Sequence, residues 1–202
     1  MKRSLIMLLA LLLSACVGGA RNAPPVTVYD FGLPAARLAR DGQWSRVALE
    51  VGSPPWFESL NVDYRLAYED PLKQREYAGS RWAGTPAALL LLRLRQQLGT
   101  VSVGVNSAAS CLLRVELQEF SQVFDSPGKS RGVLQSGVSL IDGKRQVVAE
   151  RQMTIEKTAA TPDARGGVNA LAEASDELGK QLAIWLDGVD KAGSAKSCLG
   201  DD

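Results

Sequence analysis

Two cysteines, Cys111 and Cys198, are the side chains best suited to form a covalent bond within this chain. In an oxidising compartment such a pair can form a disulfide. The bond would close a loop of about 87 residues, which stabilises a fold by roughly 4 kcal/mol on the chain-entropy account. Two alternatives stay open. One is a reactive thiol, although no histidine is present to activate it; the other is two unpaired cysteines, with Cys198 in a polar tail.

The absence of histidine also narrows the catalytic chemistry. It excludes Ser-His-Asp and Cys-His catalysis, the zincin motifs and the commonest metal ligand. Ser126-Pro127-Gly128-Lys129 matches the Ser-x-x-Lys pattern of penicillin-recognising enzymes, but its Pro-Gly step favours a hairpin turn where those enzymes begin a helix. Glu116 and Glu119 are three apart on a predicted strand, so we expect them on opposite faces. We therefore predict no catalytic residue, no cofactor, no metal site and a protein that is not an enzyme.

The N-terminus has the features of a secretory signal. Lys2 and Arg3 precede a nine-residue apolar run at 5–13, and small residues follow. A membrane-spanning helix needs about 20 residues, so this run is too short to anchor the chain. Leu13-Ser14-Ala15-Cys16 resembles the lipobox of bacterial lipoproteins, in which the peptide is cut before the cysteine and the thiol and new amine are acylated. The alternative is a plain signal peptide with a chance cysteine.

The composition of the chain that remains after this cleavage limits its domain count and its class of partner. Removing residues 1–15 leaves 187 of the 202 residues, which suits one domain. Basic residues fall from 23 to 21 against 22 acidic ones, and no basic stripe points to nucleic acid. We divide the chain into a signal peptide (1–15), a lipidated Cys16 with its spacer (16–25), a single domain (26–188) and a polar C-terminal tail (189–202).

Hydrophobic periodicity predicts an α/β (α+β) fold. Its expected form is a mixed, largely antiparallel sheet covered by two main helices. The first helix should begin after a Thr85 cap with Pro86 at its first position and end at Gly99. The other expected elements are strands at 26–31 and 46–51, a hairpin of 63–69 and 74–79, strands at 111–124, 131–141 and 145–157, and an amphipathic helix at 167–188.

A family resemblance emerges from the order of several weak motifs. They are a strand at 47–51, then Pro54-Pro55-Trp56-Phe57, a tyrosine-rich hairpin at 64–68, Arg81-Trp82-Ala83 and a leucine helix at 86–98. With the lipobox, Tyr29-Asp30-Phe31 and a final helix ending in Trp185-Leu186, this order resembles the ABC-type transport auxiliary lipoproteins, the family of the paraquat-inducible lipoprotein C. Gly84 departs from the pattern, which has a longer polar residue there, and so does the Cys111/Cys198 pair.

The resemblance implies a three-layer fold like that of anticodon-binding domains and the N-terminal domain of TolB. It implies a non-enzymatic role beside an ABC transporter permease and ATPase and their MCE-domain protein, in lipid transport between the two bacterial membranes. Val17 after the cysteine, by the sorting rule of such lipoproteins, favours the periplasmic face of the outer membrane. The resemblance leaves open contact with phospholipid and homo-oligomerisation. The alternative function is a binding or assembly lipoprotein of another envelope machine, related to peptidoglycan or lipopolysaccharide.

Half of the 12 aromatic residues lie within a 27-residue stretch. They are Trp56, Phe57, Tyr64, Tyr68, Tyr77 and Trp82. Tyrosine and tryptophan favour interfaces because each has an apolar body and a polar end. Trp82 precedes a buried helix, so we expect it in the core. Trp56, Phe57 and Tyr64 are the predicted partner-contact residues, the first two because they follow two prolines in a loop.

Overall fold

The structure is a computed structural model that describes residues 25–33, 36–40, 42–103 and 109–199. The predicted signal peptide, Cys16 and almost all of the spacer lie outside the described residues. Within these ranges no helix is both long and apolar enough to cross a membrane.

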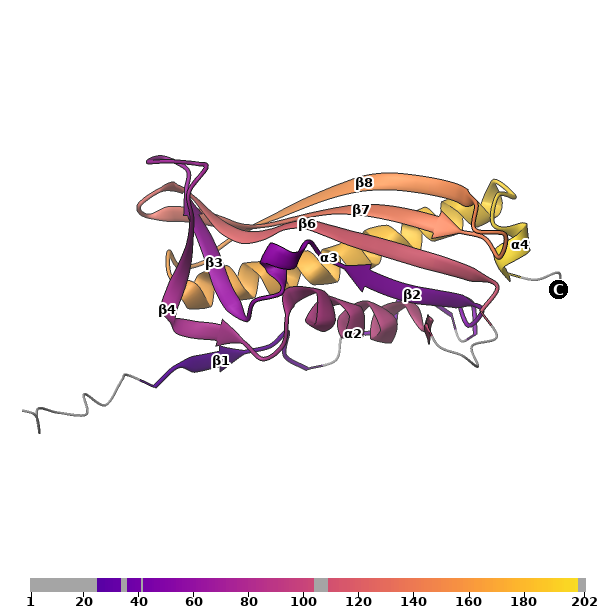
Figure 1. The fold of residues 1–202 in the computed structure, drawn as a ribbon, viewed down its shortest axis with the longest axis horizontal. Coiled ribbons are helices and arrows are strands. Elements are labelled where there is room, and N and C mark those ends of the chain that lie inside the picture. Colours follow the sequence, from indigo (N-terminus) through magenta and orange to yellow (C-terminus); the bar gives the residue numbers. More distant parts are fainter. Residues whose placement is uncertain (1–24, 34–35, 41, 104–108, 200–202) are drawn as a thin grey trace, which may run out of the picture.

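The described residues form one eight-stranded mixed sheet organised around a long central strand, β6 (Cys111–Ser126). On one edge of β6, β2 (Val47–Gly52) and β3 (Asn61–Leu66) pair in parallel, one after the other. On the other edge, β7 (Lys129–Ile141) pairs antiparallel and is followed by β8 (Val147–Thr158). The remaining strands are β1 (Thr27–Tyr29), β4 (Gln74–Trp82) and β5 (Val101–Ser102) (Figure 1).

Local signals place the first long helix as predicted. α2 (Pro86–Leu98) begins after Thr85, whose hydroxyl accepts a hydrogen bond from the Ala88 N–H, and Pro86 takes the first position. It ends at Gly99, which adopts a left-handed φ of 67° that glycine tolerates without steric cost. The second long helix, α3 (Ala164–Lys191), is capped by the Asp163 carboxylate. It begins three residues before the predicted 167–188 helix and ends three residues after it.

Both helices pack on one face of the sheet, and Figure 1 shows α3 running along β7 and β8 while α2 lies below β2. A single core joins the two helices to the sheet, and its fully buried leucines include Leu90, Leu113 and Leu178. At Gly132 of β7 the sheet backbone comes close to the helix backbone, since a Cβ atom there would lie 2.8 Å from the Leu171 nitrogen of α3. The α+β fold class is confirmed. The arrangement is a sheet with one helix layer, where the resemblance implied three layers.

A β-bulge changes which β6 residues face the core. The register with β7 shifts between Leu117 and Glu119, so Phe120 rather than Glu119 continues the buried row. Glu116 pairs with Gly137 and Glu119 with Gln135, and these partners are two apart on β7. Glu116 and Glu119 therefore share the face opposite the helices, because the extra residue of a bulge reverses the alternation. The predicted placement on opposite faces is wrong.

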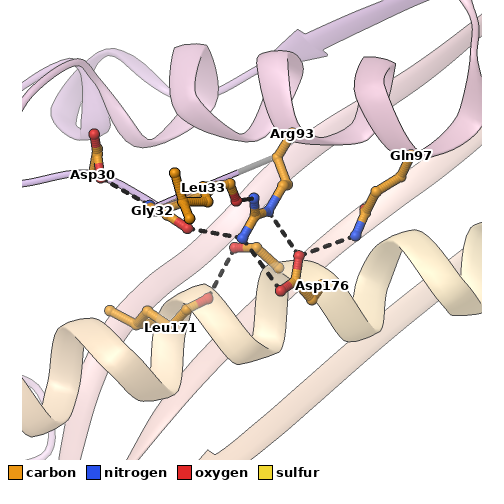
Figure 2. Close-up of polar contacts among 9 residues, drawn as sticks. Asp30, Gly32, Leu33, Arg93, Gln97, Leu171 and Asp176 are labelled. Atoms are coloured by element: carbon orange, nitrogen blue, oxygen red, sulfur yellow. Dashed lines mark hydrogen bonds and ion pairs between the residues drawn. The ribbon is translucent and has the colours of Figure 1, made fainter. Parts of the chain in front are cut away.

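A polar cluster around Arg93 fixes the N-terminal segment to both helices. The Arg93 side chain of α2 is buried, pairs with Asp176 of α3 at 2.7 Å and donates to the backbone carbonyl of Phe31 at 2.8 Å. A further donation goes to the Leu33 carbonyl, and Gln97 donates to Asp176 at 3.0 Å. Figure 2 shows the guanidinium between the segment that follows β1 and α3. The charged Arg93 is thus paired and hydrogen-bonded, as a buried cation must be.

The C-terminal segment is folded against the sheet. After Lys191 the chain turns into a short helix, α4 (Lys196–Leu199), and Ala195 and Cys198 are fully buried. Cys198 is bonded to Cys111 at the start of β6. Of the segment divided off above as a polar tail (189–202), the first residues continue α3 to Lys191, and the disulfide holds α4 on the end of the sheet.

Candidate functional site

Of the two aromatic residues that follow Pro54 and Pro55, Trp56 lies on the surface and Phe57 lies in the core. Pro54 and Pro55 lead into a 3₁₀ turn, η2 (Pro55–Phe57), in which the Phe57 N–H donates to the Pro54 carbonyl at 2.9 Å. Successive residues of such a turn point about 120° apart. Trp56 is accordingly 70% exposed and Phe57 only 3%. Phe57 is therefore a core residue, and its predicted role in partner contact is wrong.

The ring of Tyr64 packs against two other aromatic rings of the same chain. Its ring centroid lies 4.5 Å from that of Tyr77 on β4 and 5.9 Å from that of Phe124 on β6. Tyr77 in turn donates its hydroxyl to Gln122 at 2.8 Å. This cluster ties β3, β4 and β6 together, so the packing explains Tyr64 without a partner. Trp82 is 1% exposed, which confirms its predicted place in the core.

An open polar groove of about 290 Å³ adjoins Trp56. Its other walls come from the loop after η2 and from the β3–β4 hairpin, whose antiparallel register sets Asp63 opposite Glu76. The lining side chains besides Trp56 are Ser59, Asn61, Asp63, Gln74, Arg75 and Glu76. One exposed tryptophan and six polar residues from three adjacent segments thus meet at one place on the surface.

Hydrogen bonds within the groove hold these polar groups in place. The Gln74 amide donates to Asp63 Oδ2 at 2.7 Å, and the Asn61 amide donates to Glu76 Oε2. Arg75 pairs through one terminal nitrogen with Glu69 at 2.7 Å, while its Nε is buried without a hydrogen-bond partner. A buried donor left unpaired costs free energy. Because this Nε is enclosed by the protein, it is not a donor that the open groove presents to a ligand.

Asp63 is the most perturbed acid of the groove. Its side chain is buried, and this burial raises the pKa of its carboxyl from 3.8 to about 6. Repulsion from Glu76 and Glu119 contributes to this rise, whereas the Gln74 hydrogen bond and the charge of Arg65 oppose it. Asp63 consequently changes protonation just below neutral pH, where an ordinary aspartate is fully ionised.

The Ser126/Lys129 pair lies at the end of a hairpin. Ser126 and Lys129 are register partners at the turn between β6 and β7. The predicted turn is confirmed. Among the described residues, no group of three or more acidic, cysteine or histidine side chains is arranged to hold a metal ion.

Sequence reasoning missed the groove because it treated its carboxylates as scattered charges. A signal was present. Asp63 opens one predicted strand and Asn61 lies two residues before it, while Gln74 and Glu76 alternate on the strand that pairs with it across Asp70-Pro71. Residues two apart on a strand share a face, so the two polar pairs had to meet in the hairpin.

Comparison with family models finds no match, and comparison with curated proteins finds none either. Solved structures do resemble the fold. A Xanthomonas campestris protein of the family DUF330 aligns with a TM-score of 0.65 and 16% identity, covering 83% of this chain and 99% of that one. An uncharacterised protein aligns with a TM-score of 0.61 and 18% identity, over 80% of this chain and 99% of its own.

A lipoprotein of Neisseria meningitidis overlaps 72% of this chain and 96% of its own at 14% identity, but its TM-score of 0.29 is too low to indicate a shared fold. The DUF330 structure and the uncharacterised protein have the fold of this chain over nearly their whole length.

Proposed function

We propose that this protein is a periplasmic lipoprotein, anchored to the outer membrane through Cys16, that serves as a non-enzymatic auxiliary component of an ABC/MCE-type lipid transport system. The role in transport comes from the motif resemblance over residues 47–98. The location comes from the lipobox and from one structural observation, the disulfide between Cys111 and Cys198.

The disulfide supports a periplasmic location because such bonds persist in an oxidising compartment. Disulfides survive in the bacterial periplasm and are rare in the reducing cytosol. Both cysteines are buried, at 4% and 0% exposure, and the bond holds α4 to β6. An export signal at one end of the chain and a structural disulfide in the folded domain point to the same compartment.

The motif order that suggests the transport family corresponds to one packed unit. β2 continues into η2, the β3–β4 hairpin follows, and Trp82 lies in the core just before α2. α2 then packs back on β2 and β5 pairs with β2, which closes the unit. The fold shared with the DUF330 protein covers 83% of the chain, so motif order and fold concern the same residues.

The Arg93 cluster suits a tethered domain. The chain that leads from the predicted anchor enters the fold at β1. Just after β1, Arg93 donates hydrogen bonds to the backbone carbonyls of Phe31 and Leu33. Force on the anchor would reach both helices through this contact, not only the three residue pairs that join β1 to β4. We propose that the cluster keeps the domain intact while lipid holds its N-terminus.

The test has two parts on native protein from membranes. Mass spectrometry should find a chain that begins at an acylated Cys16, and Cys16→Ser should leave it unacylated and released from membranes. Tagged wild-type protein should co-purify with an MCE-domain protein encoded beside an ATPase and a permease. An intact Met1 would refute the anchor, and an anchored protein that never recovers the MCE protein would refute the transport role.

A further inference from the structure

Trp56 presents an exposed aromatic ring beside a polar groove. Its side chain is 70% exposed, and the neighbouring Phe57 anchors the same turn in the core at 3% exposure. Pro54 and Pro55 restrict the backbone on its N-terminal side. A ligand that covers this ring would bury apolar surface without displacing any packing of the fold.

The groove beside Trp56 presents donors and acceptors together. Asn61, Gln74 and Arg75 supply N–H groups, and Asp63 and Glu76 supply carboxylate oxygens. With both acids ionised and Arg75 positive, the lining carries one net negative charge, which disfavours phosphate and other anions. The groove is open to solvent, so it suits a ligand that lies along the surface.

A sugar ring can contact both parts of this surface, the indole ring through its C–H groups and the polar side chains through its hydroxyl groups. Its axial C–H groups carry partial positive charge and can lie on the negative face of an indole ring. Its hydroxyl groups can donate to the carboxylates of Asp63 and Glu76 and accept from the amides of Asn61 and Gln74. A peptide would also contact Trp56, but a hydrophobic protein hot spot usually has an apolar surround, and here the surrounding side chains are all polar.

We propose that the groove formed by Trp56 and the β3–β4 hairpin is a binding site for a neutral oligosaccharide. One sugar residue stacks on Trp56, and the neighbouring hydroxyls bond to Asp63, Glu76 and the amides of Asn61 and Gln74. The site is independent of the proposed transport role. It gives the anchored domain a contact with a glycan of the envelope.

The experiment uses the full-length lipoprotein in detergent. Calorimetric titration with chitotetraose, and with maltotetraose as a second neutral glycan, should give saturable binding to at least one. Trp56→Ala should weaken that binding by about tenfold or more, Trp56→Tyr should retain most of it, and Glu76→Gln should weaken it by a smaller factor. Ile184→Ala, at an exposed apolar residue of α3 (71% exposed), is the matched control and should bind like wild type.

Sedimentation with purified peptidoglycan sacculi distinguishes an envelope glycan from a free sugar. Wild type should co-sediment and Trp56→Ala should not. Absence of binding to both oligosaccharides and to sacculi would overturn the proposal, as would binding that Trp56→Ala leaves unchanged. Loss of MCE-protein recovery in Trp56→Ala, without glycan binding by wild type, would identify a protein interface instead. None of these results depends on whether Cys16 is acylated.

Discussion

Arg93 and Asp176 form a 2.7 Å ion pair that joins the two helices beneath the sheet, and the same guanidinium holds the backbone after β1. The pair connects residues 83 positions apart in sequence. Arg93 is almost completely enclosed, with 8% of its side chain exposed, while Asp176 is 34% exposed. The arginine therefore depends on its partners more than the aspartate does.

Arg93→Ala should lower the free energy of unfolding by about 2–4 kcal/mol, because it removes the cation paired with Asp176 and leaves the Phe31 and Leu33 carbonyls without this donor. Asp176→Asn should cost less, since an amide oxygen still accepts from Arg93 and Gln97. Urea denaturation measures both. Gln96→Ala, at an exposed position of the same helix, is the control and should change stability by no more than about 0.5 kcal/mol.

Local sequence signals determined α2, whereas pairing between distant strands determined the sheet and the groove beside Trp56. Thr85, Pro86 and Gly99 act within one turn of the chain, so the ends of α2 could be predicted to the residue. The β-bulge near Glu119 and the parallel pairing of β2 and β3 along one edge of β6 depend on partners distant in sequence. The burial of Asp63 follows from that pairing and could not be predicted from its own neighbours.

Reduction of the disulfide should destabilise the domain measurably. The bond between Cys111 and Cys198 spans 87 residues, and a loop of this size is worth up to about 4 kcal/mol on the chain-entropy account. The urea midpoint should fall when a reductant is added to wild type. Cys198→Ala should have the lower midpoint from the start and should not respond to reductant. A wild-type midpoint that is the same with and without reductant would contradict the structure.

Asp63→Asn should stabilise the protein at pH 8 but not at pH 4. Because burial raises its folded-state pKa to about 6, the folded chain retains a proton that the unfolded chain has lost between about pH 4 and 6. Stability therefore falls as pH rises through this window, and above it the buried charge costs at most about 3 kcal/mol. Asparagine removes that cost and can still accept from Gln74.

Unfolding curves of wild type and Asp63→Asn at pH 4, 6 and 8 provide the measurement. Glu76, Glu119 and Arg65 also act on Asp63, so all three remain unchanged in both proteins. Asp190→Asn, an exposed acid of α3, is the control and should show no comparable gain at pH 8. An equal effect of Asp63→Asn at all three pH values would show that its burial does not control its charge.

Substitutions of the adjacent residues Trp56 and Phe57 should affect stability very differently, because only Phe57 is buried. Phe57→Ala removes a ring that is 3% exposed and should lower the free energy of unfolding by about 3–5 kcal/mol. Trp56→Ala removes a ring that is 70% exposed and should change stability by about 0.5 kcal/mol or less. Urea denaturation of the two single variants decides the matter. Similar losses in both would mean that Trp56 packs into the fold, which would remove the exposed platform on which the proposed glycan site depends.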